Sequence, residues 1–110
     1  MPINIGENCE LNNLQIKKYK NIIIGDNVKI GANVVFDVTN DLFIDDRTVI
    51  GNDVKICGRK VKIGKECWLD ENVLIGGGSC YELLSELIMG DWVHLGRNVC
   101  INTARKVSIG

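Results

Sequence analysis

Residues 44–75 read IDDRTVIGNDVKICGRKVKIGKECWLDENVLI, and this stretch decides the fold of the chain. Aliphatic residues recur in it at a spacing of six, with one interval of seven: Ile44, Ile50, Ile56, Ile63, Leu69 and Ile75. A half-buried strand would alternate every two residues and a helix would repeat about every 3.6 residues, so neither explains the spacing. A sustained period of six indicates an internal hexapeptide repeat, and such repeats predict a solenoid.

Each hexapeptide is expected to form one flat side of a three-sided coil. Six extended residues span about 20 Å, and a turn at each end closes the side. The aliphatic residue at the head of the hexapeptide points inward, as does the small residue four positions later. A glycine directly after the head allows positive φ or a close approach of backbones, and asparagine at the fourth position fits a left-handed corner. Parallel pairing of successive coils then buries an interior that no single coil can bury alone.

The repeat can be phased along the whole chain. The residues that head successive coils lie 19, 20, 19, 26 and 20 residues apart: Ile5, Ile24, Ile44, Ile63, Met89 and Ile109. The long interval predicts a protruding loop near residues 76–88, which contains Tyr81. Residues 15–20 are polar and irregular, and we expect them to turn a corner and cover part of the N-terminal end. The expected architecture is a single all-β domain over residues 1–110, with about five coils and no C-terminal cap.

Composition excludes several classes of partner. The net charge is −1, so no basic footprint favours nucleic acid or an anionic membrane surface. No apolar run approaches the roughly 20 residues of a membrane span, and the first residues lack a secretory pattern. The sequence therefore predicts a cytoplasmic protein that contacts neither nucleic acid nor membrane.

The cysteines are expected to be packing residues. The chain has five of them, at positions 9, 57, 67, 80 and 100, and an odd number without a CxxC pair argues against a closed disulfide set. Cys9 and Cys67 fall on the small inward position of their hexapeptides, where a thiol behaves as a small apolar group. A zinc site made of Cys57, Cys67 and His94 would lack any recognised ligand spacing, so no metal is expected.

Residues 24–29 (IGDNVK), 50–55 (IGNDVK) and 95–100 (LGRNVC) resemble the repeats of the hexapeptide-repeat acyltransferases, a family that includes sugar and antibiotic O-acetyltransferases. The resemblance covers nearly the whole chain and implies a left-handed parallel β-helix. It also implies a CoA-dependent O- or N-acyltransferase for a sugar-like acceptor, acetyl-CoA as the donor, and a homotrimer with active sites between subunits. In the family the catalytic histidine and the donor site commonly lie in later coils, so this chain resembles an N-terminal portion or a shortened member.

The chemistry of that family requires a histidine as general base, because a neutral imidazole can accept the acceptor's proton near pH 7. His94 is the only histidine of the chain, and it holds the last, outward position of its hexapeptide. Trp68 holds the same position one coil earlier, above Val49 and Lys29. We therefore predict His94 as the catalytic base. We place Trp68, Trp92 and Tyr81 in the substrate site, with the predicted loop entering the same coil.

A second hypothesis is a non-catalytic β-helix, either a scaffold that assembles through its faces or open ends or a domain appended to a larger enzyme. Acetyl-CoA binding with a defined stoichiometry would separate it from the enzyme hypothesis. A γ-class carbonic anhydrase shares the fold but needs three metal-binding histidines, and this chain has one. Ice binding would need ranks of outward threonines, which the three threonines of the chain do not supply.

Overall fold

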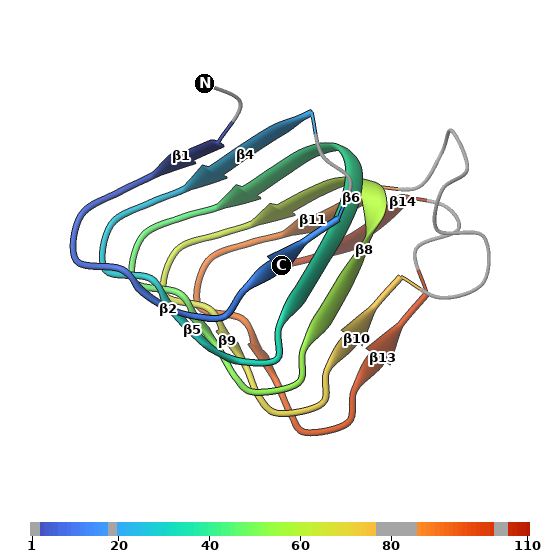
Figure 1. The fold of residues 1–110 in the computed structure, drawn as a ribbon. Coiled ribbons are helices and arrows are strands. Elements are labelled where there is room, and N and C mark those ends of the chain that lie inside the picture. Colours follow the sequence, from blue (N-terminus) through green and yellow to red (C-terminus); the bar gives the residue numbers. More distant parts are fainter. Residues whose placement is uncertain (1–2, 18–19, 77–85, 103–105) are drawn as a thin grey trace.

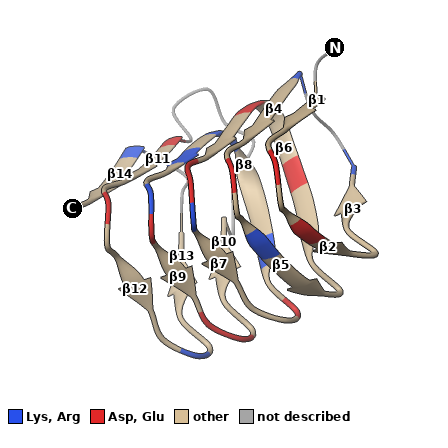
Figure 2. Ribbon diagram, turned by 90° about the vertical axis from the view of Figure 1, so that its left-hand side faces the viewer, with Lys and Arg blue, Asp and Glu red and all other residues tan. Residues whose placement is uncertain are grey.

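The computed structural model describes residues 3–17, 20–76, 86–102 and 106–110, and these form a parallel β-solenoid of about five coils. In Figure 1 the chain turns counterclockwise as it recedes from the N-terminal coil, and Figure 2 shows the coils following one another from N to C, so the solenoid is left-handed. The predicted fold class is therefore confirmed. None of the described residues forms a helix of the length and apolarity needed to span a membrane.

Each coil has three flat sides, and every side is a stack of parallel strands. Side 1 consists of β1 (Ile3–Ile5), β4 (Asn21–Ile24), the second halves of β6 (Val35–Ile44) and β8 (Lys55–Ile63), β11 (Glu86–Met89) and β14 (Lys106–Ile109). Side 2 consists of β2 (Glu10–Asn12), β5 (Lys29–Ala32), β7 (Val49–Ile50), β9 (Trp68–Leu69) and β12 (His94–Leu95). Side 3 consists of β3 (Gln15–Ile16), the first halves of β6 and β8, β10 (Leu74–Ile75) and β13 (Cys100–Ile101).

The interior is filled by the residues that the repeat places inward. Ile24, Ile44 and Ile63 head three successive coils, pair in register on side 1 and are at most 2% exposed. Burial of each such side chain stabilises the fold by roughly 1.5–3 kcal/mol. Apolar residues two positions before four of the heads are buried in the same way: Ile22, Leu42, Val61 and Leu87.

Polar atoms at the small inward position find backbone partners in the next coil. The acceptor is each time the carbonyl of a glycine that follows a coil head: Cys9 Sγ donates to Gly25 at 3.1 Å, Thr48 Oγ1 to Gly64 at 2.8 Å and Cys67 Sγ to Gly90 at 3.0 Å. Burial raises the pKa of the Cys67 thiol, and the nearby charge of Asp91 adds to that shift. Cys67 therefore stays protonated and can donate its hydrogen bond. The prediction that Cys9 and Cys67 pack in the interior is confirmed.

The corners adopt the left-handed backbone that the asparagines predicted. Six of the ten described non-glycine residues with positive φ are asparagines: Asn8, Asn13, Asn27, Asn33, Asn72 and Asn98. The other four occupy the same fourth position of a hexapeptide: Arg47, Asp53, Glu66 and Trp92. The repeat thus imposes the corner conformation even on residues that do not favour it.

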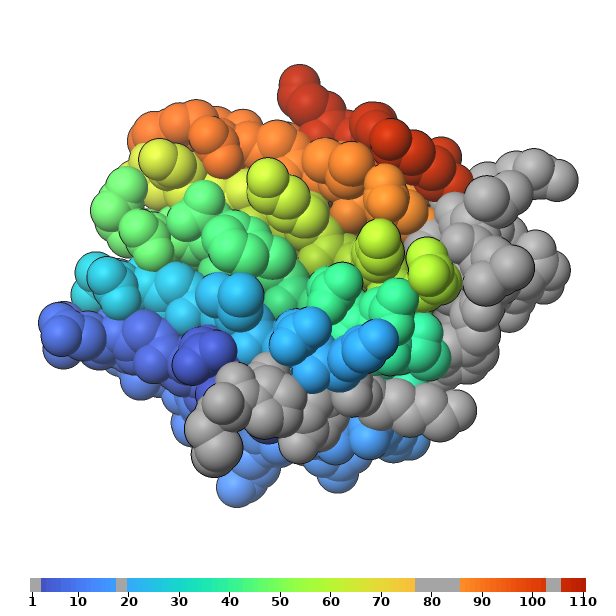
Figure 3. Space-filling view, turned by 90° about the horizontal axis from the view of Figure 1, so that it is seen from above, coloured from blue at the N-terminus to red at the C-terminus, as the bar shows by residue number. Residues whose placement is uncertain are grey.

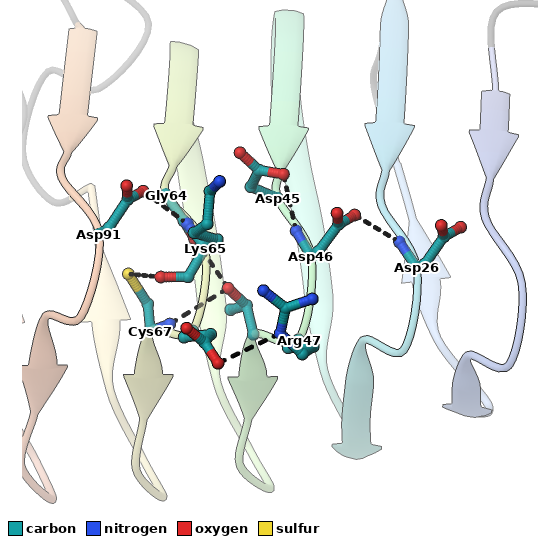
Figure 4. A network of polar contacts seen from close by, with 10 residues as sticks. Asp26, Asp45, Asp46, Arg47, Gly64, Lys65, Cys67 and Asp91 are labelled. Atoms are coloured by element: carbon teal, nitrogen blue, oxygen red, sulfur yellow. Dashed lines mark hydrogen bonds and ion pairs between the residues drawn. The ribbon is translucent and has the colours of Figure 1, made fainter.

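Aspartates at the third hexapeptide position bind each coil to the preceding one (Figure 4). Asp46 Oδ1 accepts the backbone N–H of Asp26 at 2.8 Å, and Asp91 Oδ1 accepts that of Lys65 at 2.8 Å. Lys65 interrupts this series, so it offers no carboxylate to the coil before it. In that preceding coil, Asp45 takes the place of the glycine that normally follows the coil head, and its Oδ1 accepts the backbone N–H of Asp46 at 2.8 Å. A change in one coil is thus matched by a change in its neighbour about 20 residues away.

The glycine after a coil head is required by this close packing. A Cβ atom at Gly25 would collide with Oδ1 of Asp46 and lie 2.9 Å from the Asp46 backbone nitrogen. We therefore expect Gly25→Ala to lower the free energy of unfolding by about 1–3 kcal/mol in urea titrations. Gly96 holds the same hexapeptide position, but a Cβ there meets no atom within 4 Å. Gly96→Ala is the matched control and should leave stability unchanged or slightly raised. Equal losses from both variants would contradict this explanation.

Two predicted boundaries differ from the structure. Residues 15–20 were expected to be irregular, but Gln15 and Ile16 form β3 and pair with β6, because Ile16 continues the apolar stack over Phe36. The loop predicted near residues 76–88 is shorter, because Glu86 to Met89 form β11 and bury Leu87. Residues 77–85, and with them Tyr81, lie outside the described residues.

Candidate functional site

His94 and Trp68 form a stacked aromatic pair on the outer surface of side 2. The two residues pair in register between β12 and β9, their ring centroids are 5.2 Å apart and their planes differ by 25°. Trp68 is 53% exposed, and the side chain of His94 is 57% exposed. Strand pairing places Lys29 and Val49 below them, which confirms the outward column predicted from the sequence.

Asp70 is the acidic neighbour of this pair. Its Oδ2 lies 4.0 Å from His94 Nε2, and its Oδ1 lies 3.8 Å from Arg97 Nε. Both distances exceed hydrogen-bond length, so these are electrostatic contacts between partly exposed groups. The same Oδ1 accepts the backbone N–H of Glu71 at 2.8 Å, which fixes the carboxylate beside the two rings.

From the sequence, Asp70 and Arg97 were not predicted to lie beside His94, although the departure of both residues from the repeat pattern was visible in it. Asp70 stands where the coil before it has Gly51, and the next coil has the cation Arg97 at its third position. Asp45 and Lys65 show the same combination at another corner. In both cases an aspartate replaces the glycine, and it accepts the N–H of the following residue.

Trp92 lies at the corner that precedes β12. It is 73% exposed and has a φ of 63°. Val93, which packs against the core, separates it from His94. Glu66 holds the equivalent position one coil earlier and forms an ion pair with Arg47 at 3.1 Å. An exposed indole on a left-handed backbone is an unfavourable combination.

We expect Trp92→Asn to raise the free energy of unfolding by about 1 kcal/mol, because asparagine tolerates the left-handed region and little buried surface is lost. Thermal unfolding followed by circular dichroism measures the change. Trp68→Asn is the control, since Trp68 lies in extended β9 and stacks on His94; it should not stabilise the fold. A Trp92→Asn variant less stable than the parent would show that Trp92 has a packing role instead.

The predicted loop attaches to the solenoid away from the aromatic pair. Gly76 follows β10 and Glu86 begins β11, so both flanks lie at the corner between sides 3 and 1. Side 2, which carries Trp68 and His94, lies opposite this corner (Figure 1). The expectation that the loop joins the aromatic site is therefore not supported by its described flanks.

The residues of the zinc alternative are not brought together. Cys57 is buried in the first half of β8, Cys67 points into the interior and His94 points out from side 2. Among the residues that the structure describes, no three side chains of His, Cys, Asp or Glu are placed to hold a metal ion.

The stacking restricts how a ligand can use these rings. His94 stacks on one face of the Trp68 indole, and Val49 pairs with Trp68 on the other side along the sheet. A ligand on side 2 would contact the exposed parts of Trp68 and His94.

No protein-family model, curated protein or solved structure matches the chain.

Proposed function

We propose that the protein is a CoA-dependent acyltransferase for a sugar-like acceptor, with His94 as the general base. One observation carries the proposal: the only histidine of the chain is exposed on a flat side, stacked on Trp68 and next to the carboxylate of Asp70.

In the proposed reaction, His94 accepts the proton of an acceptor hydroxyl or amine. The acceptor atom attacks the carbonyl carbon of the acyl thioester, the C–S bond breaks, and the leaving sulfur takes the proton from His94, so that CoA leaves as its thiol. The carboxylate of Asp70 lies 4.0 Å from the imidazole that accepts the proton. The protein contributes positioning and proton transfer, and the latter is typically worth about 10²–10⁴-fold in rate.

The groups around His94 suit a carbohydrate acceptor. The apolar face of a sugar ring can pack on the exposed indole of Trp92 or Trp68, while its hydroxyl groups donate to carboxylates. Asp70 supplies such a carboxylate 4.0 Å from the imidazole. Arg97 is 70% exposed beside it and offers a cation for an anionic group such as a phosphate of CoA.

The test is an assay of CoA release from acetyl-CoA in the presence of a panel of sugars and amino sugars. Chromatographic detection of CoA is preferable to a thiol reagent, because the exposed Cys100 would react with the reagent. We expect release that depends on the acceptor, together with an acetylated product of the correct mass. Absence of release with every acceptor, combined with no calorimetric binding of acetyl-CoA, would overturn the proposal.

A second candidate function is a scaffold without catalytic activity. The observation in its favour is the flat outer surface of side 1, where Ile23 and Ile88 are 42% and 36% exposed. A scaffold would fail the assay described above and would still associate through this surface.

A further inference from the structure

We propose that side 1 is the interface of a twofold-symmetric dimer in which the axes of the two solenoids are antiparallel. This inference concerns a different side from the aromatic site and does not depend on acyl transfer. It follows from the order of the outward side chains on side 1, whose strands appear as successive bands from blue to red in Figure 3.

An apolar column crosses the face. Strand pairing aligns the outward residues Asn4, Ile23, Phe43, Lys62, Ile88 and Ser108. An open groove of about 350 Å³ lies over β6, β8 and β11, and its lining includes Phe43 and Ile88. The ammonium of Lys62 lies 5.8 Å from the centroid of the Phe43 ring and so stands between the apolar residues.

A polar column runs beside it with alternating charge. The aligned residues are Asn21, Asp41, Lys60, Glu86 and Lys106. Two contacts lie within the column: the Asn21 amide donates to Asp41 Oδ1 at 2.9 Å, and Lys106 Nζ lies 3.7 Å from Glu86 Oε1. In a column of alternating charge, take the midpoint between two neighbouring charges. Charged residues at equal distances on either side of that midpoint then have opposite signs. Such a column can pair with an inverted copy of itself.

One register satisfies both columns. A twofold axis parallel to the strands, between β6 and β8, brings each strand of side 1 opposite a different strand of the partner. Every aligned outward residue except Lys106, which lies opposite no described residue, then meets a complementary one: Asp41 meets the partner's Lys60, Asn21 the partner's Glu86, Ile23 the partner's Ile88, Phe43 the partner's Lys62 and Asn4 the partner's Ser108. These are one ion pair, two polar pairs, one apolar pair and one cation–π pair.

Other arrangements are less complementary. An axis through β8 would place Lys60 and Lys62 opposite their own copies and Asp41 opposite the partner's Glu86, which sets like charges against each other. A twofold axis parallel to the solenoid would keep each strand opposite itself. Lys60 would then face the partner's Lys62, and Glu86 would face the partner's Ile88. An axis between β8 and β11 would pair Lys60 with the partner's Glu86 and Asp41 with the partner's Lys106, but it would set Lys62 against the partner's Ile88 and leave Ile23 without a partner. The antiparallel register between β6 and β8 is the one that matches the apolar column as well as the polar one.

The size of the face sets the expected affinity. Six strands about 4.8 Å apart and a side about 20 Å long give roughly 580 Å² per copy. The total of about 1,150 Å² lies near the lower limit for a specific interface. We therefore expect a dimer that forms at micromolar concentrations.

Sedimentation velocity of residues 1–110 between about 1 and 200 μM tests the proposal. The weight-average mass should rise from the 12.2 kDa of one chain to twice that value. A mass of one chain throughout the range would overturn the proposal, as would a trimer.

Charge variants test the register. Lys60→Glu places a carboxylate opposite the partner's Asp41 and should weaken the dimer at least about tenfold. The double variant Asp41→Lys with Lys60→Glu restores an ion pair of reversed polarity and should recover dimerisation. Lys55→Glu is the matched control, because Lys55 lies on the same strand but points outward on side 3. It should leave the dimer unchanged.

Ile88→Glu should abolish the dimer, since it places a carboxylate against the partner's Ile23. Circular dichroism spectra must show that each variant is folded. Equal weakening by Lys55→Glu and Lys60→Glu, or a double variant that does not recover, would overturn the proposed register. Because His94 lies on side 2, none of these variants should alter acyl transfer, so failure of one proposal leaves the other testable.

Discussion

Replacement of His94 by glutamine is expected to lower the rate of acceptor-dependent acyl transfer by about 10²–10⁴-fold. Glutamine keeps a polar, planar end group over Trp68 but cannot accept the acceptor's proton as an imidazole does. His94 is exposed and lies outside the core, so the unfolding midpoint should change little. The measurement is kcat/KM for CoA release by the parent and the variant under the same conditions.

Two controls make this result specific. Lys29→Gln changes another outward residue of the same column and should leave the rate unchanged. Asp70→Asn should reduce the rate less than about tenfold, because Asp70 Oδ2 lies 4.0 Å from the imidazole and both groups are partly exposed. An His94→Gln variant that keeps the parental rate would remove His94 from the mechanism and favour the scaffold function.

Replacement of Phe36 by alanine is expected to lower the free energy of unfolding by about 3–5 kcal/mol. Phe36 is fully buried and lies between Ile16 and Ile56 of the adjacent coils. The truncation leaves a cavity that these neighbours cannot fill without moving the strands on which they lie. For a domain with a typical total stability of about 5–15 kcal/mol, this loss is large. Guanidinium titration at low protein concentration measures it.

The second phenylalanine of the chain provides the matched control. Phe43 lies on the same strand but points outward on side 1, so Phe43→Ala should cost about 1 kcal/mol or less when the protein is monomeric. The same variant should weaken the proposed dimer. Similar losses of stability from Phe36→Ala and Phe43→Ala would contradict the inward and outward orientation on which the whole repeat rests.

Much of the fold followed from the sequence because the repeat is local. Which residues face inward is set within one hexapeptide, so Ile44 and Thr48 could be placed without knowledge of distant residues. The left-handed corners followed for the same reason, through asparagines such as Asn27. The stack of Trp68 on His94 was predictable as well, because both hold the last position of corresponding hexapeptides in successive coils.

Tertiary structure decided what depends on contacts between coils. The hexapeptide spacing could not show that Asp70 lies beside His94, that Asp45 compensates for Lys65, or that the loop flanks lie opposite the aromatic pair. Each of these relations joins residues about 20 or more positions apart, and the registers depend on corners of unequal length. The sequence by itself therefore determined which residues face inward and that the chain coils in flat hexapeptide sides. The arrangement of the outward side chains, and with it both proposed surfaces, required the stacked structure.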